Sequence, residues 1–418
     1  MKRYDLVLIK PVIRNMINPF GSLTLSLIFL QSWLQHHYNV NVKVIHLDEY
    51  ENDYSVIPEA SVYGIGFSTP QVPETKDLYR YLKETFPGCV VIGGGAHPSA
   101  LPYHSLETPL CDVVVRGYGE EALGIFLSDG IDFRYMITND HPEYGPELDT
   151  GQSGCYNGYI DLSSYRDVPL CYHDINQNLV YKWVVTNSIG CFYRCNYCFR
   201  IVDRVYDYPR EFVFNCIEDA YKLRGREKPV FFLDEDIFFR FEEKLEYLQF
   251  AHKLGLPFCC HGRPDKIIYD QARILKELGC TDVRIGVETG SPSLLKKMNK
   301  RFNYEDVETG CDAMHKAGLT FSFYLLSDYP GETIEDLEQT IDFVKKTRPH
   351  EVKVSSYIPL PGSSDWYGMP LEERNKLHER WDDFYFAGMN GQGGLEISHC
   401  QILRDAFSGL NVFEHLKK

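Results

Sequence analysis

Three cysteines crowd into one short segment of this sequence, at Cys191, Cys195 and Cys198. Three and then two residues separate them, so one loop can present all three thiolates. Three thiolates can ligate three irons of a [4Fe-4S] cluster and leave the fourth iron open. A zinc site or chance clustering would also gather cysteines, but zinc needs a fourth ligand in regular spacing, and none follows closely. The spacing therefore predicts an iron-sulfur cluster.

The segment from Asn187 to Phe199, with the aromatic Tyr197 before its last cysteine, resembles the signature of the radical S-adenosylmethionine (SAM) superfamily. Further motifs follow in the order of that superfamily between residues 181 and 365. The resemblance implies that the open iron chelates the amino and carboxylate groups of SAM, with Tyr197 beside the cofactor. It also implies reductive cleavage of SAM to a 5′-deoxyadenosyl radical, which abstracts hydrogen from an unactivated carbon.

Four further side chains are candidates for holding SAM. Asp234 and Glu235 end the second strand of the predicted barrel, where the family positions the SAM amino group, and carboxylates suit an ammonium ion. Arg263 follows the third strand and resembles the family's Arg-containing element, so it is a candidate partner for the SAM carboxylate or another anion. A surface salt bridge would explain Arg263 equally well. Glu288 lies in a motif that resembles the fourth-strand element, which implies contact with ribose hydroxyls.

The N-terminal part of the chain carries a second set of candidate residues. Ser68 and Thr69 follow one predicted strand, and Gly94 and Gly95 follow the next. Ligands bind at such strand ends in parallel sheets, and glycine lets a bulky group approach the backbone. The stretch from Tyr63 to Glu121 resembles the cobalamin-binding domain fused to one branch of radical SAM enzymes. That resemblance implies cobalamin as a further cofactor.

Two departures from the cobalamin-binding relatives leave an alternative open for the N-terminal domain. The sequence has no Asp-x-His-x-x-Gly element to supply a histidine to cobalt. Tyr118 stands where relatives often carry an acidic residue. A separate departure lies in the barrel, where Ser327 to Tyr329 stand in place of the glycine that relatives commonly carry, and it bears on the contacts with the ribose and adenine of SAM. The alternative is an N-terminal domain that keeps the fold without the cofactor and serves as a substrate platform.

Three functional hypotheses follow from these residues. The fused architecture resembles cobalamin-dependent methyltransferases, which implies C-methylation of a peptide or metabolite. A second hypothesis uses Cys400 as hydrogen-atom donor in a radical SAM peptide epimerase of ribosomal peptide maturation, although a free cysteine is often a buried structural residue. A third, a non-catalytic protein that keeps its cluster for sensing, is disfavoured by the ordered set of SAM motifs.

The elements that must position these residues follow an α/β rhythm. Residues 1–139 are predicted to form a five-stranded, doubly wound, Rossmann-like domain of the cobalamin-binding type. Residues 140–180 are rich in Gly, Pro, Asp, Asn and Ser and are predicted to form a linker. Six strands within residues 181–365 predict a partial (β/α)6 radical SAM barrel, and residues 366–418 a short C-terminal cap segment.

The composition of the chain limits the kinds of binding partner that we expect. The chain has 418 residues, with 43 basic and 59 acidic side chains and a formal net charge of −16, which makes nucleic acid an improbable partner. Its cysteines are too sparse for a disulfide scaffold. We find no segment apolar enough to span a bilayer and no signal peptide, so we expect a cytoplasmic protein. Its expected partners are a small-molecule or peptide substrate and an electron donor such as flavodoxin or ferredoxin.

Overall fold

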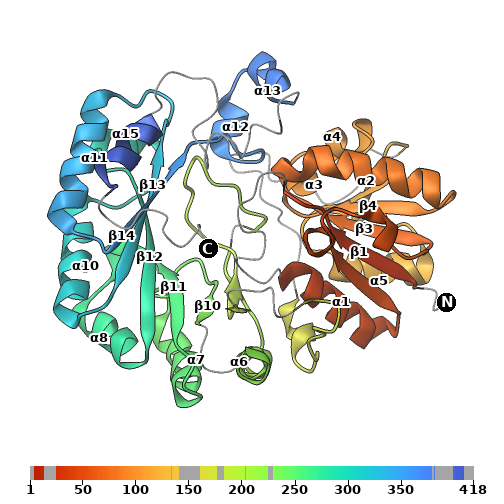
Figure 1. Cartoon of the computed structure of the whole chain (residues 1–418), viewed down its shortest axis with the longest axis horizontal. Helices are drawn as coiled ribbons and strands as arrows, with labels where there is room; N and C mark the ends of the chain where they lie inside the picture. Colours follow the sequence, from red (N-terminus) through yellow and green to blue (C-terminus); the bar gives the residue numbers. More distant parts are fainter. Residues whose placement is uncertain are drawn as a thin grey trace.

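The computed structural model describes residues 4–13, 25–132, 134–140, 161–176, 183–202, 204–224, 229–378, 381 and 399–408. These residues form two α/β lobes, each built on a six-stranded sheet (Figure 1). The N-terminal lobe is drawn in red to orange, and the C-terminal lobe in green to blue.

The N-terminal sheet has the strand order β2-β1-β3-β4-β5-β6. Its strands are β1 (Leu6–Lys10), β2 (Val42–His46), β3 (Val62–Gly66), β4 (Val90–Gly94), β5 (Val113–Val115) and β6 (Met136–Thr138). The first five run parallel, whereas β6 pairs antiparallel with β5. The prediction of five strands is therefore one strand short, because the short Met-Ile-Thr segment of β6, unlike the Val-Val-Val of β5, is not a continuous apolar run.

Helices cover both faces of this sheet, which confirms the doubly wound architecture. Alternate residues of β1 point to opposite faces. Leu6 and Leu8 share a core with α1 (Leu25–Tyr38) and α5 (Glu120–Asp129), whereas Val7 and Ile9 share another with α2 (Val72–Thr85). The lobe also contains the short helices α3 (Ala96–Ala100) and α4 (Pro102–Glu107).

The C-terminal sheet has the order β14-β13-β12-β11-β10-β7, and all its pairs are parallel. Its strands are β7 (Trp183–Val185), β10 (Val230–Phe232), β11 (Phe258–Gly262), β12 (Cys280–Glu288), β13 (Phe321–Ser327) and β14 (Glu351–Ser356). Helices α6 (Arg210–Arg224), α7 (Phe241–Lys253), α8 (Tyr269–Glu277), α10 (Tyr304–Ala317) and α11 (Ile334–Thr347) lie along its outer side in Figure 1. The predicted six-stranded partial barrel is confirmed.

Helix α1 lies between the lobes and joins them. The ring of Phe29 meets Tyr208 and Phe212 edge-on, with centroids 5.6 and 5.2 Å apart. The described part of the predicted linker, residues 161–176, packs on the same lobe, where the Asp174 carboxylate accepts hydrogen bonds from Gln31 and Lys43. This part of the segment is therefore held in place by α1 and β2.

The C-terminal segment also touches both lobes. Helices α12 (Ser364–Gly368) and α13 (Leu371–Leu377) follow the barrel, and α15 (His399–Ala406) packs on α11 and β14. The buried rings of Trp366 and Trp381 belong to the core beneath α2 in the N-terminal lobe. Residues 396–398, which precede this helix, lie outside the described residues.

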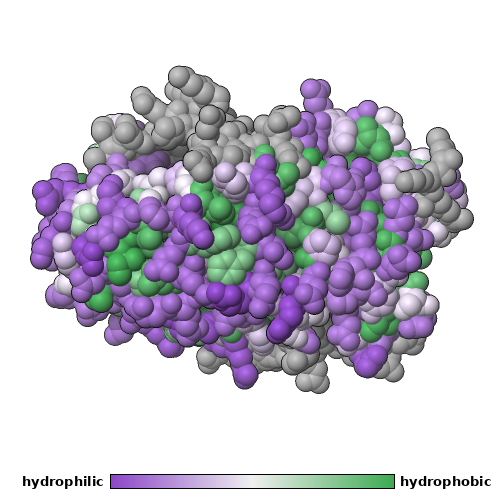
Figure 2. All heavy atoms as spheres, turned by 90° about the horizontal axis from the view of Figure 1, so that it is seen from below, coloured by the Kyte–Doolittle hydropathy of each residue, from purple (hydrophilic) through white to green (hydrophobic). Residues whose placement is uncertain are grey.

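The described helices include none long and apolar enough to cross a membrane. Figure 2 shows one face of the molecule, on which hydrophilic side chains predominate and hydrophobic residues form separate patches between them.

Candidate cofactor site between the two lobes

The predicted cluster loop begins directly after the first barrel strand. A short hairpin of β8 (Ser188–Ile189) and β9 (Tyr206–Asp207) frames it. Gly190 adopts a positive φ of 86°, and a Cβ there would clash with the carbonyl oxygen of Arg204. Only glycine fits such a turn, and it directs the chain into the loop that carries the three half-buried thiols Cys191, Cys195 and Cys198.

The environment of these thiols suits a positively charged metal cluster. The pKa of Cys198 is raised to about 12, chiefly by burial and also by the neighbouring Cys195 and Glu235. Burial also raises the pKa of Cys191. Thiolates are the ligating form, so iron must supply the charge that stabilises them. Three thiols on one enclosed loop therefore fit the predicted [4Fe-4S] cluster.

Strand β12 anchors this loop through Tyr197. The phenol donates a hydrogen bond to Glu288 Oε1 at 2.9 Å, and Lys300 Nζ donates to the same oxygen at 2.9 Å. The backbone N–H of Asn196 donates to Met298 O at 3.0 Å. The structure thus brings together Tyr197 and Glu288, two of the predicted cofactor-binding residues, at the carboxyl end of the barrel.

Asp234 and Glu235 have different environments. Asp234 is buried and accepts hydrogen bonds from Ser188 Oγ and the backbone of Asn187, so it holds the turn that leads into the cluster loop. Glu235 lines the cavity between the lobes and is accessible from it. Burial raises the pKa of Glu235, Asp234 raises it further, and the Arg200 guanidinium lowers it. Of the two carboxylates, Glu235 is the one available to a ligand.

Arg263 is held by neighbouring groups. Its guanidinium lies 3.6 Å from the centroid of the Tyr193 ring. Its Nε pairs with Asp265 at 3.0 Å, and its Nη2 donates to Lys300 O at 2.9 Å. Both partners of this ion pair are more than nine-tenths buried, so it is an internal link and not a surface one. Arg263 does not line the cavity that Glu235 faces.

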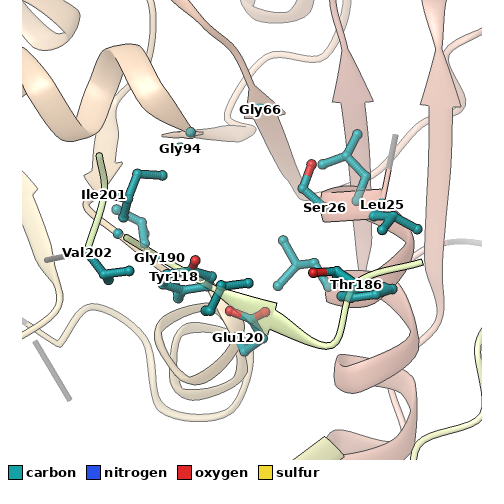
Figure 3. Close-up of a pocket in the computed structure, with 18 of the residues that line it drawn as sticks. Leu25, Ser26, Gly66, Gly94, Tyr118, Glu120, Thr186, Gly190, Ile201 and Val202 are labelled. Atoms are coloured by element: carbon teal, nitrogen blue, oxygen red, sulfur yellow. The ribbon is translucent and has the colours of Figure 1, made fainter. Parts of the chain in front are cut away.

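A cavity of about 450 Å³ separates the glycine-rich edge of the N-terminal sheet from the cluster loop. Figure 3 shows Gly66 and Gly94 at one edge, with Tyr118, Glu120 and Thr186 across from them. From the C-terminal lobe the cavity is lined by Thr186, Ser188, Ile189, Gly190, Cys191, Cys198, Phe199, Arg200, Ile201, Val202, Tyr208, Leu233 and Glu235. One space therefore reaches both the N-terminal strand ends and two of the three thiols.

The predicted residues of the N-terminal lobe divide into two groups. Gly94 and Gly95 line the cavity. At Gly95, φ is 98° and a Cβ would lie 2.8 Å from Phe67 O, so the turn requires glycine. Ser68 and Thr69 are not among the lining residues: Ser68 bonds the Gln71 side chain, and Thr69 Oγ1 lies 3.1 Å from His97 Nδ1. A glycine edge facing an apolar space fits a bulky cofactor.

The structure also shows cavity residues that the sequence motifs do not single out. Arg200 lies two positions after Cys198 and lines the cavity. Glu120 begins α5 and accepts a hydrogen bond from Tyr165 at 2.6 Å. Leucines 25, 27 and 30 of α1 form an apolar wall. The proximity of Arg200 to the last cysteine is the sequence feature that could have indicated it.

Cys400 lies apart from this site. It is 1% exposed, and its Sγ contacts Val354 O at 3.9 Å under helix α15. Val354 belongs with Cys400 and Leu403 to the core outside the sheet, and burial raises the pKa of the thiol. Cys400 does not line the cavity, so the structure does not favour its assigned role as a donor to a substrate radical.

At Ser327 to Tyr329, where relatives commonly carry glycine, the backbone still adopts a conformation that favours glycine. Asp328 has a φ of 61°, a region that aspartate tolerates better than most residues. Its N–H donates to Glu332 Oε2 at 2.7 Å, and His399 lies 2.9 Å from the same oxygen. These contacts hold the turn after β13 and dock α15 beside it.

Two family models match the chain, one to each lobe. The radical SAM superfamily model matches residues 188–344, and the B12 binding domain model matches residues 36–127. The first match contains the cluster loop with Glu235 and Glu288. The second contains Gly94 and Gly95.

Similar proteins include two methyltransferases. The bacteriochlorophyllide d C-12(1)-methyltransferase of Chlorobaculum tepidum is 23% identical, over 95% of this chain and 85% of that protein. An uncharacterised methyltransferase of Pyrococcus horikoshii is 23% identical, over 74% of this chain and 69% of that protein.

Solved structures share the fold of both lobes. The radical SAM methyltransferase TsrM from Kitasatospora setae, with cobalamin and a [4Fe-4S] cluster bound, superposes with a TM-score of 0.68 at 18% identity, over 86% of this chain and 73% of that one. The cobalamin-dependent SAM radical enzyme OxsB gives a TM-score of 0.62 at 16% identity, over 92% of this chain and 56% of that one. The chain thus contains a radical SAM domain and an N-terminal B12-binding domain, and these domains imply a [4Fe-4S] cluster, SAM and cobalamin as its cofactors.

Proposed function

We propose that this chain is a methyltransferase that adds a methyl group to an unactivated carbon of a small metabolite or a peptide. The observation that carries the proposal is the shared cavity. Its walls include Gly94 and Gly95 of the B12-binding domain and Cys191 and Cys198 of the cluster loop. Reaction partners held in one shared cavity are positioned for reaction without a diffusional encounter.

The residues of the chain have distinct roles in this proposal. When bound, the cluster supplies the electron that cleaves SAM, and cobalamin supplies a transferable methyl group. Cys191, Cys195 and Cys198 hold the cluster, and Glu235 binds the SAM ammonium group through its carboxylate. The leucines of α1 give the cavity an apolar wall, and an apolar wall disfavours water beside a reactive carbon-centred species.

The relatives support a small acceptor. The TsrM structure with a SAM analogue also holds a tryptophan substrate, and its fold covers 84% of this chain. Both similar proteins named above are methyltransferases by name. The place of Cys400 on the outer side of β14 does not favour the epimerase hypothesis.

The cluster must receive its electron from outside the chain. We propose a low-potential protein donor such as flavodoxin or ferredoxin. A cytoplasmic location is part of the same proposal, because the cluster thiols need a reducing compartment.

The first test is cofactor content. The chain is purified without oxygen, reconstituted with iron, sulfide and hydroxocobalamin, desalted, and assayed for iron and cobalt. We expect about four irons and one cobalt per chain. The matched control replaces Cys191, Cys195 and Cys198 by alanine, which should abolish iron and leave cobalt unchanged. An iron-loaded protein without cobalt would contradict the cobalamin-dependent reaction.

The second test is methyl transfer. The loaded protein is incubated with reductant, SAM carrying a trideuterated methyl group, and a small-molecule extract as the source of acceptors. Products that gain the label are sought by mass spectrometry, together with 5′-deoxyadenosine. Label in a carbon-bound methyl group supports the proposal. Formation of 5′-deoxyadenosine with no labelled product from metabolite or peptide fractions would count against it.

A further inference from the structure

Arg200 is a buried cation with unused hydrogen-bond donors at the wall of the cavity. The residue is 9% exposed and lines the space between the lobes. Its Nη1 donates to Cys191 O at 3.1 Å, while its Nε is buried and has no hydrogen-bond partner among the described residues. A guanidinium has five N–H donors and stays charged, and a buried charge without a counterion is unfavourable. The position therefore suits an anionic ligand.

Glu235 places the opposite charge in the same cavity. Within the described part of the chain its carboxylate has no hydrogen bond and no ion pair, and it is accessible from the cavity. Its charge interacts with that of Arg200, yet no ion pair joins the two. A cation and an anion held apart on one wall match a ligand that carries both charges, such as an amino-acid zwitterion.

Three other cations near the cluster loop are paired with protein groups. Lys300 donates to Glu288 at 2.9 Å, and Arg263 pairs with Asp265 at 3.0 Å. Lys244 donates to Asp236 O at 2.7 Å. Among the described lining residues, Arg200 is the only lysine, arginine or histidine. Among the described lining residues, Arg200 is therefore the basic side chain available to bind an anion in the cavity.

We propose that Arg200 binds the carboxylate of SAM while Glu235 binds its ammonium group. The two side chains then form a clamp for the methionine end of SAM next to Cys191 and Cys198, and Arg200 takes the role that the family resemblance suggested for Arg263. The phosphate of cobalamin is an alternative anionic ligand for Arg200. The carboxylate of Glu235 would repel this phosphate, because the phosphate group carries no positive charge to compensate. The inference rests on SAM as a cofactor and holds whether or not the chain transfers methyl groups.

The test measures ligand affinity without turnover. Dissociation constants of SAM and of decarboxylated SAM, which keeps the ammonium group and lacks the carboxylate, are measured by equilibrium dialysis on the cluster-loaded, unreduced protein. Arg200→Met should weaken SAM binding about ten- to a hundredfold, the range of a hydrogen bond to a charged group, and leave decarboxylated SAM nearly unchanged. Arg200→Lys should recover part of the loss. Glu235→Gln should weaken both ligands, because both carry the ammonium group.

Controls separate binding from folding. Arg210→Met removes an exposed arginine of α6, 59% accessible in its side chain and paired with Glu246, and should change neither constant. The iron content and melting temperature of Arg200→Met must match those of the parent protein. If either falls, the affinities of Arg200→Lys and Glu235→Gln for the two ligands decide whether the clamp exists. Equal losses for both SAM forms in Arg200→Met and Arg200→Lys would overturn the clamp. So would unchanged SAM binding with weakened cobalamin binding, which would assign Arg200 to the phosphate.

Discussion

Tyr197 and Glu288 are joined by a hydrogen bond of 2.9 Å that ties the cluster loop to the end of β12. Burial raises the pKa of Tyr197 well above its ordinary value, and the charge of Glu288 raises it further, so the phenol remains a donor. Lys300 donates to the same carboxylate oxygen and balances its charge. The three groups fix the loop of the cysteines relative to the barrel.

Substitutions in this trio should differ in cost. Tyr197→Phe removes one hydrogen bond to a charged group and should lower the unfolding free energy by about 1.5–3 kcal/mol. Glu288→Leu leaves Lys300 as a buried cation, because its side chain is 8% exposed, and should cost about 3–5 kcal/mol. Thermal unfolding followed by circular dichroism checks both. The double variant Glu288→Leu with Lys300→Met should recover most of the loss; if it is as unstable as Glu288→Leu, charge burial is not the cause.

The glycine edge allows a paired prediction. A Cβ at Gly94 would come no nearer than 3.9 Å to Val115 O, so Gly94→Leu should fold normally and project its side chain into the cavity. Its cobalamin affinity, measured by absorbance titration with hydroxocobalamin, should fall at least about tenfold. Gly95→Ala should instead lose about 1–3 kcal/mol of stability, because of its positive φ. Normal cobalamin binding by a folded Gly94→Leu would show that this edge is not the contact.

The sequence predicts those parts of the site that are local. Cys191, Cys195 and Cys198 share one loop, so their spacing alone indicates a cluster. Gly94 and Gly95 end a strand of a parallel sheet, and the topology places such ends at one edge. These features need no knowledge of how distant segments pack.

Other features depend on tertiary packing and could not be read from the chain. Asp234 and Glu235 are adjacent, but only the three-dimensional turn decides that one is buried beneath Ser188 and the other faces the cavity. Arg263 and Arg200 both lie near family motifs. Only the structure shows that Arg263 is paired with Asp265, whereas the Nε of Arg200 has no hydrogen-bond partner among the described residues. The amphipathic pattern of α15 predicts that Cys400 and Leu403 face a core, but only tertiary packing shows that this core lies on the outer side of β14, away from the site.

The two classes of cysteine should respond differently to substitution. Cys195→Ala removes a cluster ligand, so iron content and SAM cleavage should both be lost. Cys400→Ala leaves a small void in a packed core and should cost about 1 kcal/mol, while iron content and 5′-deoxyadenosine formation stay at the parent level. Both are measured on reconstituted protein. Loss of product formation in a folded, iron-loaded Cys400→Ala would return the thiol to the chemistry.

A hydrogen-bonded chain of histidines links the C-terminal segment to the B12-binding domain. Trp381 Nε1 donates to His104 Nε2 at 3.3 Å, so His104 carries its proton on Nδ1. That nitrogen lies 3.0 Å from His97 Nε2, and His97 Nδ1 lies 3.1 Å from Thr69 Oγ1. Each ring donates to the next, and the chain ends at the loop that precedes α2. It requires neutral rings.

Acid should therefore weaken this link. The pKa of His104 is lowered from 6.5 to about 4, chiefly by burial and also by the neighbouring His378. The unfolded chain takes up a proton near pH 6.5 and the folded chain does not, so stability falls as the pH drops from 6.5 towards 4. His104 should contribute roughly 2 kcal/mol to that fall. His104→Asn keeps a donor and an acceptor but does not titrate, so its melting temperature should depend less steeply on pH than that of the parent. Parallel curves between pH 7 and 4.5 would show that the chain does not control acid stability.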